Sequence, residues 1–253
     1  MNKPIVLTIA GSDSIGGAGI QADITTINDI GCHAATVVTA VTAQNSLGVH
    51  AVYSIPSNII KAQIESVMNE YQPSAIKIGM VYSSDTVRCI FETLSQYSIP
   101  PIVYDPVMVA SSGGSLMSSD TLETITQYIF PISTLITPNI PEASKLLNIP
   151  IITSDTICDA AQQLVKRYKC NILLKGGHLS EDVLTDVLAT KNKEDVDIIK
   201  TQRIKGDNFH GTGCRLSSGI AGYIAQGYSI LDSIKMSKES LERYYINTFG
   251  YKK

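Results

Sequence analysis

Short runs of apolar, mostly β-branched residues alternate along this chain with longer stretches whose apolar residues recur every three or four positions. The short runs predict strands and the longer stretches predict helices. Strands that alternate with helices are joined by right-handed crossovers and pair into a mostly parallel sheet. The sequence therefore predicts an α/β fold with a mostly parallel central sheet, in one domain that spans residues 1–253.

The strands predicted first lie at residues 5–10, 35–41, 75–78, 101–105, 134–137 and 171–175, and helices are predicted at 57–70, 85–97, 120–128 and 155–168. Two further strands, at 183–190 and 195–201, are expected to form a hairpin-like edge, and helices at 213–226 and 230–247 follow them. Ligands of an open parallel sheet bind beyond the carboxyl ends of its strands. We therefore expect the functional residues in the loops after the strands.

Composition excludes several classes of protein. The 253 residues are 44% hydrophobic and 17% charged, as in a folded domain that buries a core. The net charge of −3 gives no sign of the basic surface that binds nucleic acid. The sequence contains no run of about 18 apolar residues, so no membrane-spanning helix is predicted. The five scattered cysteines form no CxxC pair, and the first apolar run is too short for a secretory signal. We therefore expect a cytoplasmic protein with neither a disulfide framework nor a zinc site.

A glycine-rich loop, residues 11–22, follows the first predicted strand. Residues 17–22 match the dinucleotide pattern GxGxxA, but no acidic residue lies between Asp29 and Glu65, where the ribose would need one. A Walker A loop is also excluded, because no GK[ST] follows Gly16. The glycines instead allow the backbone to approach a ligand closely.

Several polar residues in and near this loop have both a structural and a functional interpretation. Ser12 or Asp13 could cap the helix that follows, in a simple tight turn. Asp23 either complements the dipole of that helix or holds an amino-substituted ring. Gln44, after the second strand, has a comparable position, although a glutamine in a loop is uninformative by itself.

A second glycine-rich loop, His210-Gly-Thr-Gly-Cys214, precedes a predicted helix rich in small residues. A helix start presents unpaired N–H groups, and its dipole favours negative charge. Gly211 and Gly213 leave room for a ligand, so the loop predicts an anion hole suited to a phosphoryl group in transfer. The helix end is expected to lower the pKa of the Cys214 thiol, which either accepts a proton or simply packs.

Two weaker signals concern the nucleotide and a metal ion. Asn139 and Glu142 have the spacing of a helix capping box, yet they follow a strand, where a carboxylate could help to bind magnesium. Lys175, followed by two glycines, offers a cation and a permissive backbone, although this pattern alone indicates a turn.

Taken together, these segments resemble the hydroxymethylpyrimidine and phosphomethylpyrimidine kinases of thiamine biosynthesis, a branch of the ribokinase-like superfamily. Each segment alone is a weak match, but they occur in the order of the family and cover nearly the whole chain. They are AGSDSIGGAGIQAD at 10–23, TAVTAQN at 39–45, KIGM at 77–80, DPVM at 105–108, TPNIPEA at 137–143, KGGH at 175–178 and HGTGC at 210–214.

The resemblance implies a three-layer α/β/α fold and an enzyme that uses ATP and Mg²⁺. It implies that a pyrimidine is held by Gln44 and Asp23 and covered by Gly11, Ala18, Met80 and Val107. ATP would lie near Asn139, Glu142, Lys175 and His210, with the metal near Glu142 and Asp105. Gly211, Thr212, Gly213 and Cys214 would form the catalytic anion hole. Many members of the family are homodimers and phosphorylate both the hydroxymethylpyrimidine and its monophosphate.

Three departures from the family pattern affect the expected efficiency and substrate range. Arg215 stands where we expect threonine, and it would either help to bind phosphate or disturb the helix start. Ser111 stands where a lysine is common, so one phosphate contact would be missing. The last residues, 248–253, lack a glycine-rich tail, so the nucleotide side of the site is expected to be more open.

Two other functions remain open at this stage. A pyridoxal or pyridoxine kinase shares a heteroaromatic substrate that carries a hydroxymethyl group, together with the cysteine-type loop. A non-catalytic relative that senses a pyrimidine is suggested by the departures at Ser111 and Arg215. Fold alone does not decide among these substrates.

Overall fold

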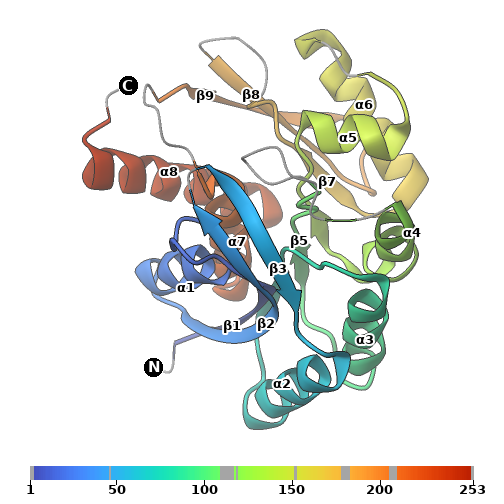
Figure 1. The fold of residues 1–253 in the computed structure, drawn as a ribbon. Coiled ribbons are helices and arrows are strands. Elements are labelled where there is room, and N and C mark those ends of the chain that lie inside the picture. Colours follow the sequence, from blue (N-terminus) through green and yellow to red (C-terminus); the bar gives the residue numbers. More distant parts are fainter. Residues whose placement is uncertain are drawn as a thin grey trace.

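A nine-stranded sheet, in the order β3-β2-β1-β4-β5-β6-β7-β8-β9, forms the middle layer of the protein (Figure 1). The structure is a computed structural model and describes residues 3–45, 47–108, 117, 119–150, 153–177, 183–204 and 210–251. The six strands from β2 to β7 are parallel, whereas β3 at one edge and β8 and β9 at the other pair antiparallel. The predicted mostly parallel sheet and its hairpin-like edge are confirmed.

The strands are β1 Ile5–Ser12, β2 His33–Asn45, β3 Gly48–Ser54, β4 Ala75–Ile78, β5 Ile102–Tyr104, β6 Leu135–Ile136, β7 Asn171–Leu174, β8 Val183–Ala189 and β9 Val196–Gln202. The α-helices are α1 Gly19–Asp29, α2 Ser57–Glu70, α3 Ser84–Leu94, α4 Ser119–Tyr128, α5 Ile140–Leu147, α6 Ser154–Tyr168, α7 Thr212–Ala225 and α8 Ile230–Phe249. A short 3₁₀ helix covers Phe130–Ile132. None of the described helices is both long and apolar enough to cross a membrane.

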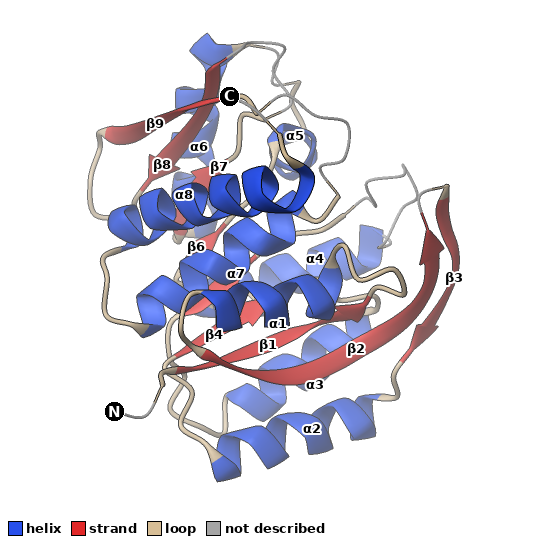
Figure 2. Cartoon of the chain, turned by 90° about the vertical axis from the view of Figure 1, so that its left-hand side faces the viewer, coloured by secondary structure: helices blue, strands red, loops and turns tan. Residues whose placement is uncertain are grey.

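Helices cover both faces of the sheet, so the three-layer α/β/α arrangement is confirmed (Figure 2). Apolar residues of α1, α7 and α8 pack on one face, and those of α2 to α6 pack on the other. Because side chains alternate along a strand, Leu7 and Ile76 face one layer while Val6 and Ala75 face the other. Two hydrophobic cores therefore lie on either side of the sheet.

Polar side chains continue the α1/α7 face of the sheet toward the carboxyl ends of the strands. Val6, Ala75, Val103, Leu135 and Leu173 belong to the core on this face. Side chains two positions apart in an extended chain point to the same face of the sheet. Two positions after each of these core residues, within the strand or just past its end, stands a polar or charged residue: Thr8, Lys77, Asp105, Thr137 and Lys175. This polar row lies beneath the start of α7, so the alternation of the strands itself builds the floor of a site.

Some elements escaped sequence-based prediction. No residue of β3 is buried, so this strand lacks a buried apolar run and carries no strong periodic signal. The strand predicted at 35–41 continues to Asn45, because it pairs antiparallel with β3 beyond the end of the parallel sheet. The helix α5 is only eight residues long, and its capping box was its clearest signal.

Candidate active site

A cavity of about 790 Å³ lies at the carboxyl ends of the parallel strands. Its wall combines backbone of the two glycine-rich loops with side chains from the central strands, from the loops that follow them and from α8. All the predicted site residues except Asp23 line it: Gly11, Ala18, Gln44, Met80, Asp105, Val107, Asn139, Glu142, Lys175, His210, Gly211, Thr212, Gly213 and Cys214. The fold thus brings these residues together at one edge of the sheet.

The second glycine-rich loop forms the start of α7, with Gly211 as its N-cap. Gly211 has a φ of 80°, which favours glycine, and a Cβ there would collide with the carbonyl oxygen of Gly17. A Cβ on Gly213 would lie 3.4 Å from both the Asp105 carboxylate and the Lys175 ammonium. The two glycine-rich loops therefore touch, and the helix start sits directly above charged side chains of the sheet.

Cys214 lines this cavity. Burial raises the pKa of the Cys214 thiol to about 11, although the nearby Lys77 ammonium opposes this rise. The predicted lowering of this pKa by the helix end is therefore wrong, because withdrawal from water outweighs the favourable charges. At neutral pH the thiol keeps its proton.

Asp105 and Lys175 form an ion pair across the floor of the cavity, with 2.8 Å between Oδ1 and Nζ. The Thr137 hydroxyl donates to the same carboxylate oxygen at 3.0 Å, and the Ser217 hydroxyl donates to Oδ2 at 3.3 Å. Burial alone would raise the pKa of Asp105, but Lys175 and Lys77 lower it below its ordinary value. The pair therefore stays charged, and Lys175 presents a cation beside the start of α7.

Asn139 and Glu142 form the capping box that their spacing predicted. The Asn139 Oδ1 accepts from the Glu142 N–H at 2.9 Å, and the Glu142 Oε2 accepts from the Asn139 N–H at 2.7 Å. Burial raises the pKa of Glu142 to about 7; the negative charge of Asp105 also raises it, while Lys175 lowers it. The structural role is thus confirmed, and the same carboxylate also lines the cavity.

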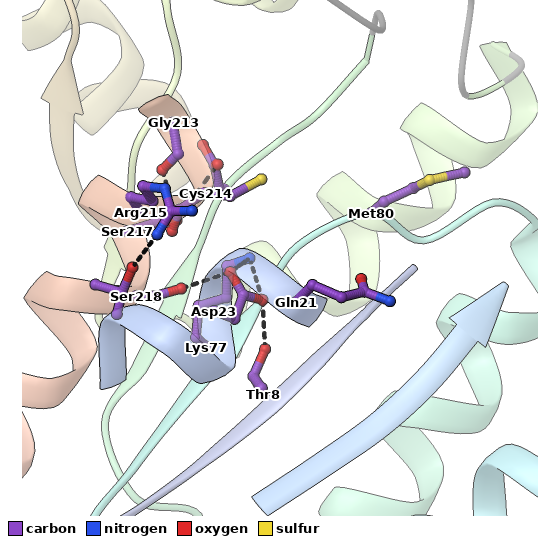
Figure 3. Close-up of polar contacts among 12 residues, drawn as sticks. Thr8, Gln21, Asp23, Lys77, Met80, Gly213, Cys214, Arg215, Ser217 and Ser218 are labelled. Atoms are coloured by element: carbon purple, nitrogen blue, oxygen red, sulfur yellow. Dashed lines mark hydrogen bonds and ion pairs between the residues drawn. The ribbon is translucent and has the colours of Figure 1, made fainter. Parts of the chain in front are cut away.

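Asp23 is fully buried and does not line the cavity. Its polar contacts are shown in Figure 3. It accepts hydrogen bonds from the Thr8 hydroxyl at 2.6 Å, the Ser218 hydroxyl at 2.6 Å and the Lys77 ammonium at 2.8 and 2.9 Å. These partners come from β1, α7 and β4, so one carboxylate ties three elements together. Direct contact between Asp23 and a pyrimidine, as expected from the resemblance, does not fit this position.

Lys77 is one of the cavity residues to which the sequence analysis gave no role. Its side chain is 1% exposed, and it lines the cavity while it is paired with Asp23. Burial would lower the pKa of Lys77, but Asp23 raises it, so the ammonium stays charged. The sequence did contain a signal, which is a lysine within the apolar strand Ala75–Ile78. A lysine is almost never fully buried without a partner, so this position indicated a buried acidic partner.

Asp13, His210 and Gln44 form a chain of contacts along one wall. The Asp13 Oδ2 accepts from the Ala18 N–H at 2.8 Å and lies 3.0 Å from the His210 Nε2. That same ring nitrogen lies 3.2 Å from the Gln44 Nε2. The expected capping of α1 by Ser12 or Asp13 is wrong, because its N-cap is Ala18. Asp13 instead links the two loops through its contacts with Ala18 and His210.

Arg215 does not line the cavity. The sequence had suggested that it either helps to bind phosphate or disturbs the start of the helix. Its guanidinium carbon lies 3.8 Å from the centroid of the Tyr244 ring, and its Nη1 donates to the Thr26 hydroxyl at 3.4 Å. It therefore joins α7 to α8 and α1 without disrupting the helix start. Ser111 and His178 lie outside the described residues.

The described part of the chain contains no group of three or more His, Cys, Asp or Glu side chains that could hold a metal ion by themselves. Asp105 and Glu142 nevertheless face the same part of the cavity. Magnesium is commonly bound by one or two carboxylates, with water and substrate phosphates completing its shell. Two carboxylates at this place fit that requirement.

The fold and the site define the class: a three-layer, ribokinase-like small-molecule kinase whose cavity lies between a helix start and a row of paired charges. The phosphomethylpyrimidine kinase family model matches residues 13–253, and the chain belongs to that family.

Two relatives and two solved structures illustrate the similarity. The thiamine biosynthesis bifunctional protein of Geobacter sulfurreducens is 39% identical over 92% of this chain, which spans only 47% of that protein. The hydroxymethylpyrimidine/phosphomethylpyrimidine kinase of Bacillus subtilis is 37% identical, with 96% of this chain and 90% of the relative covered.

Among solved structures, phosphomethylpyrimidine kinase from Clostridium difficile 630 has a TM-score of 0.83 and 39% identity, covering 95% of this chain and 99% of the other. The Bacillus subtilis pyridoxal kinase in complex with ADP has a TM-score of 0.86 and 29% identity, covering 94% of this chain and 90% of the other.

Proposed function

We propose that this chain transfers the γ-phosphoryl group of ATP to the hydroxymethyl group of 4-amino-5-hydroxymethyl-2-methylpyrimidine, and then phosphorylates the resulting monophosphate to give the diphosphate for thiamine synthesis. The observation that carries the proposal is the contact between Gly17 and Gly211. It joins the loop expected to hold the acceptor to the helix start expected to hold the phosphoryl group. Reactants bound on either side would therefore meet.

The acceptor side suits a flat, amino-substituted heteroaromatic ring. The Gln44 amide supplies both a donor and an acceptor, and its contact with His210 restricts its orientation. Met80, Val107 and Ala18 supply apolar surface on the same cavity. Asp23 contributes indirectly, by holding the Lys77 ammonium in the floor.

The donor side suits a nucleotide and Mg²⁺. Lys175 and the start of α7 offer positive charge to phosphate oxygens, and Asn139 and His210 line the same cavity. Glu142 and Asp105 would hold the metal ion, which neutralises charge on the phosphates when it is bound. A divalent cation would also relieve the repulsion between these two buried carboxylates.

In the transfer step, the acceptor oxygen forms a bond to the γ-phosphorus while the bond to the β-phosphate oxygen breaks, and ADP leaves with the electron pair. The transition state is loose, so stabilising the transferred charge matters more than a strong base. A protonated Cys214 fits this demand as a hydrogen-bond donor at the anion hole. The hydroxyl proton leaves late, with the product phosphate oxygens as its acceptor.

A pyridoxal kinase activity is the second candidate, supported by the likeness to the solved pyridoxal kinase. Its substrate also carries a hydroxymethyl group on a heteroaromatic ring, and an aldehyde could react reversibly with the Cys214 thiol. A non-catalytic pyrimidine sensor has less support, because Arg215 is accounted for by its contacts with Tyr244 and Thr26.

The deciding experiment measures ADP release by the purified chain with Mg²⁺-ATP and equal concentrations of hydroxymethylpyrimidine, its monophosphate, pyridoxal or no acceptor. Turnover of both pyrimidines is expected. Turnover of pyridoxal by a wide margin over the pyrimidines would overturn the proposal. Tight pyrimidine binding without ADP release would indicate the sensor.

We also propose a cytoplasmic homodimer that pairs through the β2–β3 edge. Large apolar side chains are exposed there or nearby, with Tyr53 67%, Leu47 85%, Ile15 55% and Val41 47% exposed. Sedimentation velocity should give twice the chain mass, and Tyr53→Glu should shift the protein toward the monomer. A monomeric parent chain at micromolar concentration would contradict this assembly.

A further inference from the structure

The last helix contacts the anion hole through a pair of hydroxyl groups. The Thr212 Oγ1 and the Tyr245 hydroxyl oxygen lie 2.6 Å apart, and both residues line the cavity. Thr212 is the first residue of α7, whereas Tyr245 lies near the end of α8. A residue far along the chain therefore reaches the loop that is expected to receive the phosphoryl group.

Tyr245 is buried in this position and packs against other aromatic rings. It is 2% exposed, and its ring stacks on Phe249 at 5.9 Å and on Tyr251 at 6.2 Å between centroids. The neighbouring Tyr244 lies under the Arg215 guanidinium at 3.8 Å. Since Arg215 is three residues after Thr212, the first turn of α7 is bound to α8 at two points.

The direction of the hydrogen bond follows from what a phosphoryl group requires. Phosphoryl oxygens only accept, and a threonine hydroxyl has a single proton to donate. If Thr212 gave that proton to Tyr245, its lone pairs would face the phosphoryl oxygens. If Tyr245 donates instead, the Thr212 hydroxyl can direct its proton to a phosphoryl oxygen when that group binds, and the accepted bond makes the threonine a stronger donor.

We propose that Tyr245 is a positioning residue, which donates to the Thr212 oxygen and thereby directs the Thr212 proton toward the transferred phosphoryl group. This inference rests on the proposed phosphoryl transfer at the same loop. Burial raises the pKa of Tyr245 above its ordinary value, so its hydroxyl keeps the proton that it must donate. The stacked rings of Tyr245, Phe249 and Tyr251 thus support the Thr212 contact at a place where the family pattern led us to expect a glycine-rich tail.

The test compares Tyr245→Phe with the parent chain, because phenylalanine keeps the stacked ring and removes only the hydroxyl. Losing one neutral hydrogen bond of about 1 kcal/mol predicts a kcat about 3- to 10-fold lower, with the acceptor KM unchanged. Tyr244→Phe is the matched control and should keep full activity. Thr212→Ser should also retain most of the activity, because it keeps the hydroxyl.

A double-mutant cycle with Thr212→Val separates positioning from a general structural effect. Once Thr212 is valine, adding Tyr245→Phe should cause no further loss of kcat. Additive losses, or an unchanged kcat in Tyr245→Phe with a normal melting temperature, would overturn the proposal.

A binding measurement keeps this test separate from that of the kinase activity. The complex of ADP, Mg²⁺ and aluminium fluoride mimics the transferred phosphoryl group, and Tyr245→Phe should bind it about 3- to 10-fold more weakly while binding ADP alone equally well. If the parent chain phosphorylates no acceptor, the proposed function fails while this comparison still decides the role of Tyr245. Equal affinity of parent and Tyr245→Phe for the mimic would contradict that role.

Discussion

Gly211 packs so closely on Gly17 that no side chain at position 211 fits between the two glycine-rich loops. A Cβ on Gly211 would strike the Gly17 carbonyl oxygen, and its φ of 80° is itself unfavourable for other residues. The two loops belong to opposite ends of the sequence. Their contact is where the acceptor and the phosphoryl group are proposed to meet.

Replacing Gly211 should therefore disable catalysis more than folding. Gly211→Ala is expected to lower kcat by about 100-fold or more, because it displaces the helix start that stabilises transferred charge. Steady-state ADP release measures this loss. Gly227→Ala is the matched control, since Gly227 also has a positive φ, of 93°, but a Cβ there meets nothing. Equal activity of the two variants would show that the loop contact is dispensable.

The raised pKa of Cys214 predicts an unreactive thiol at neutral pH. Since the thiolate is the nucleophile, alkylation of Cys214 by iodoacetamide should be slow at pH 7 and should accelerate as the pH rises toward about 11. Mass spectrometry of the Cys214 peptide gives this profile. A rate that is already maximal near pH 7 would mean that the helix end controls the thiol after all.

Cys214→Ala is expected to lower turnover while leaving pyrimidine affinity largely intact, because the thiol faces the anion hole. Calorimetry with the pyrimidine and ADP-release kinetics separate the two effects. Cys158→Ala, which removes a half-buried thiol that does not line the cavity, should change neither quantity. Unchanged turnover in Cys214→Ala would make this cysteine structural.

The buried pair of Asp23 and Lys77 should be costly to break on one side. Asp23→Asn or Lys77→Met alone leaves an uncompensated buried charge, and each is expected to destabilise the fold by about 3–5 kcal/mol. The double variant removes both charges and should recover much of that stability. Chemical denaturation measures the three variants, and simple additivity of the two single losses would argue against a coupled pair.

Gln44 is expected to act on acceptor affinity. Gln44→Ala should raise the KM for the pyrimidine about 5- to 10-fold, the effect of a lost hydrogen bond, with the KM for ATP unchanged. Gln63→Ala removes a glutamine that bonds the Val38 backbone outside the cavity, and it should have no kinetic effect. A change in ATP affinity alone would show that Gln44 is assigned to the wrong substrate.

Glu142→Gln tests the proposed metal ion. The glutamine oxygen still accepts from the Asn139 N–H, so the capping box survives while the negative charge is lost. The Mg²⁺ concentration for half-maximal activity should rise about tenfold, as one carboxylate ligand becomes a weaker amide. Glu65→Gln, at a half-buried position on α2 outside the cavity, is the control. An unchanged Mg²⁺ requirement would remove Glu142 from the metal site.

The sequence predicted the parallel sheet and most site positions because both depend on local patterns. The run Ile5–Ser12 and the loop after it carry their own signals, as does the loop His210 to Cys214. The strand β3 was missed because an exposed edge strand need not be apolar. The sequence suggested the wrong role for Asp23 and gave none to Lys77, because their pairing joins residues 54 positions apart.

The sequence also failed to predict how the fold changes the pKa of Cys214 and what the charge of Arg215 contacts. The helix start at Cys214 is a local signal that favours a low thiol pKa, whereas burial depends on the whole surrounding structure. The role of Arg215 could likewise not be predicted, because its guanidinium packs on Tyr244, which lies on a different helix.

The polar row on the α1/α7 face also constrains how the sheet assembles. A shift of β4 by one residue would turn Lys77 into the apolar core around Leu7 and Ile9, and would bring Ile76 or Ile78 to the floor of the cavity. Such a misaligned sheet would bury an unpaired ammonium and leave Asp23 without its cation. The buried pair of Lys77 and Asp23 thus penalises a misaligned β4 during folding, so the side chains that form the floor of the cavity also fix the register of the sheet.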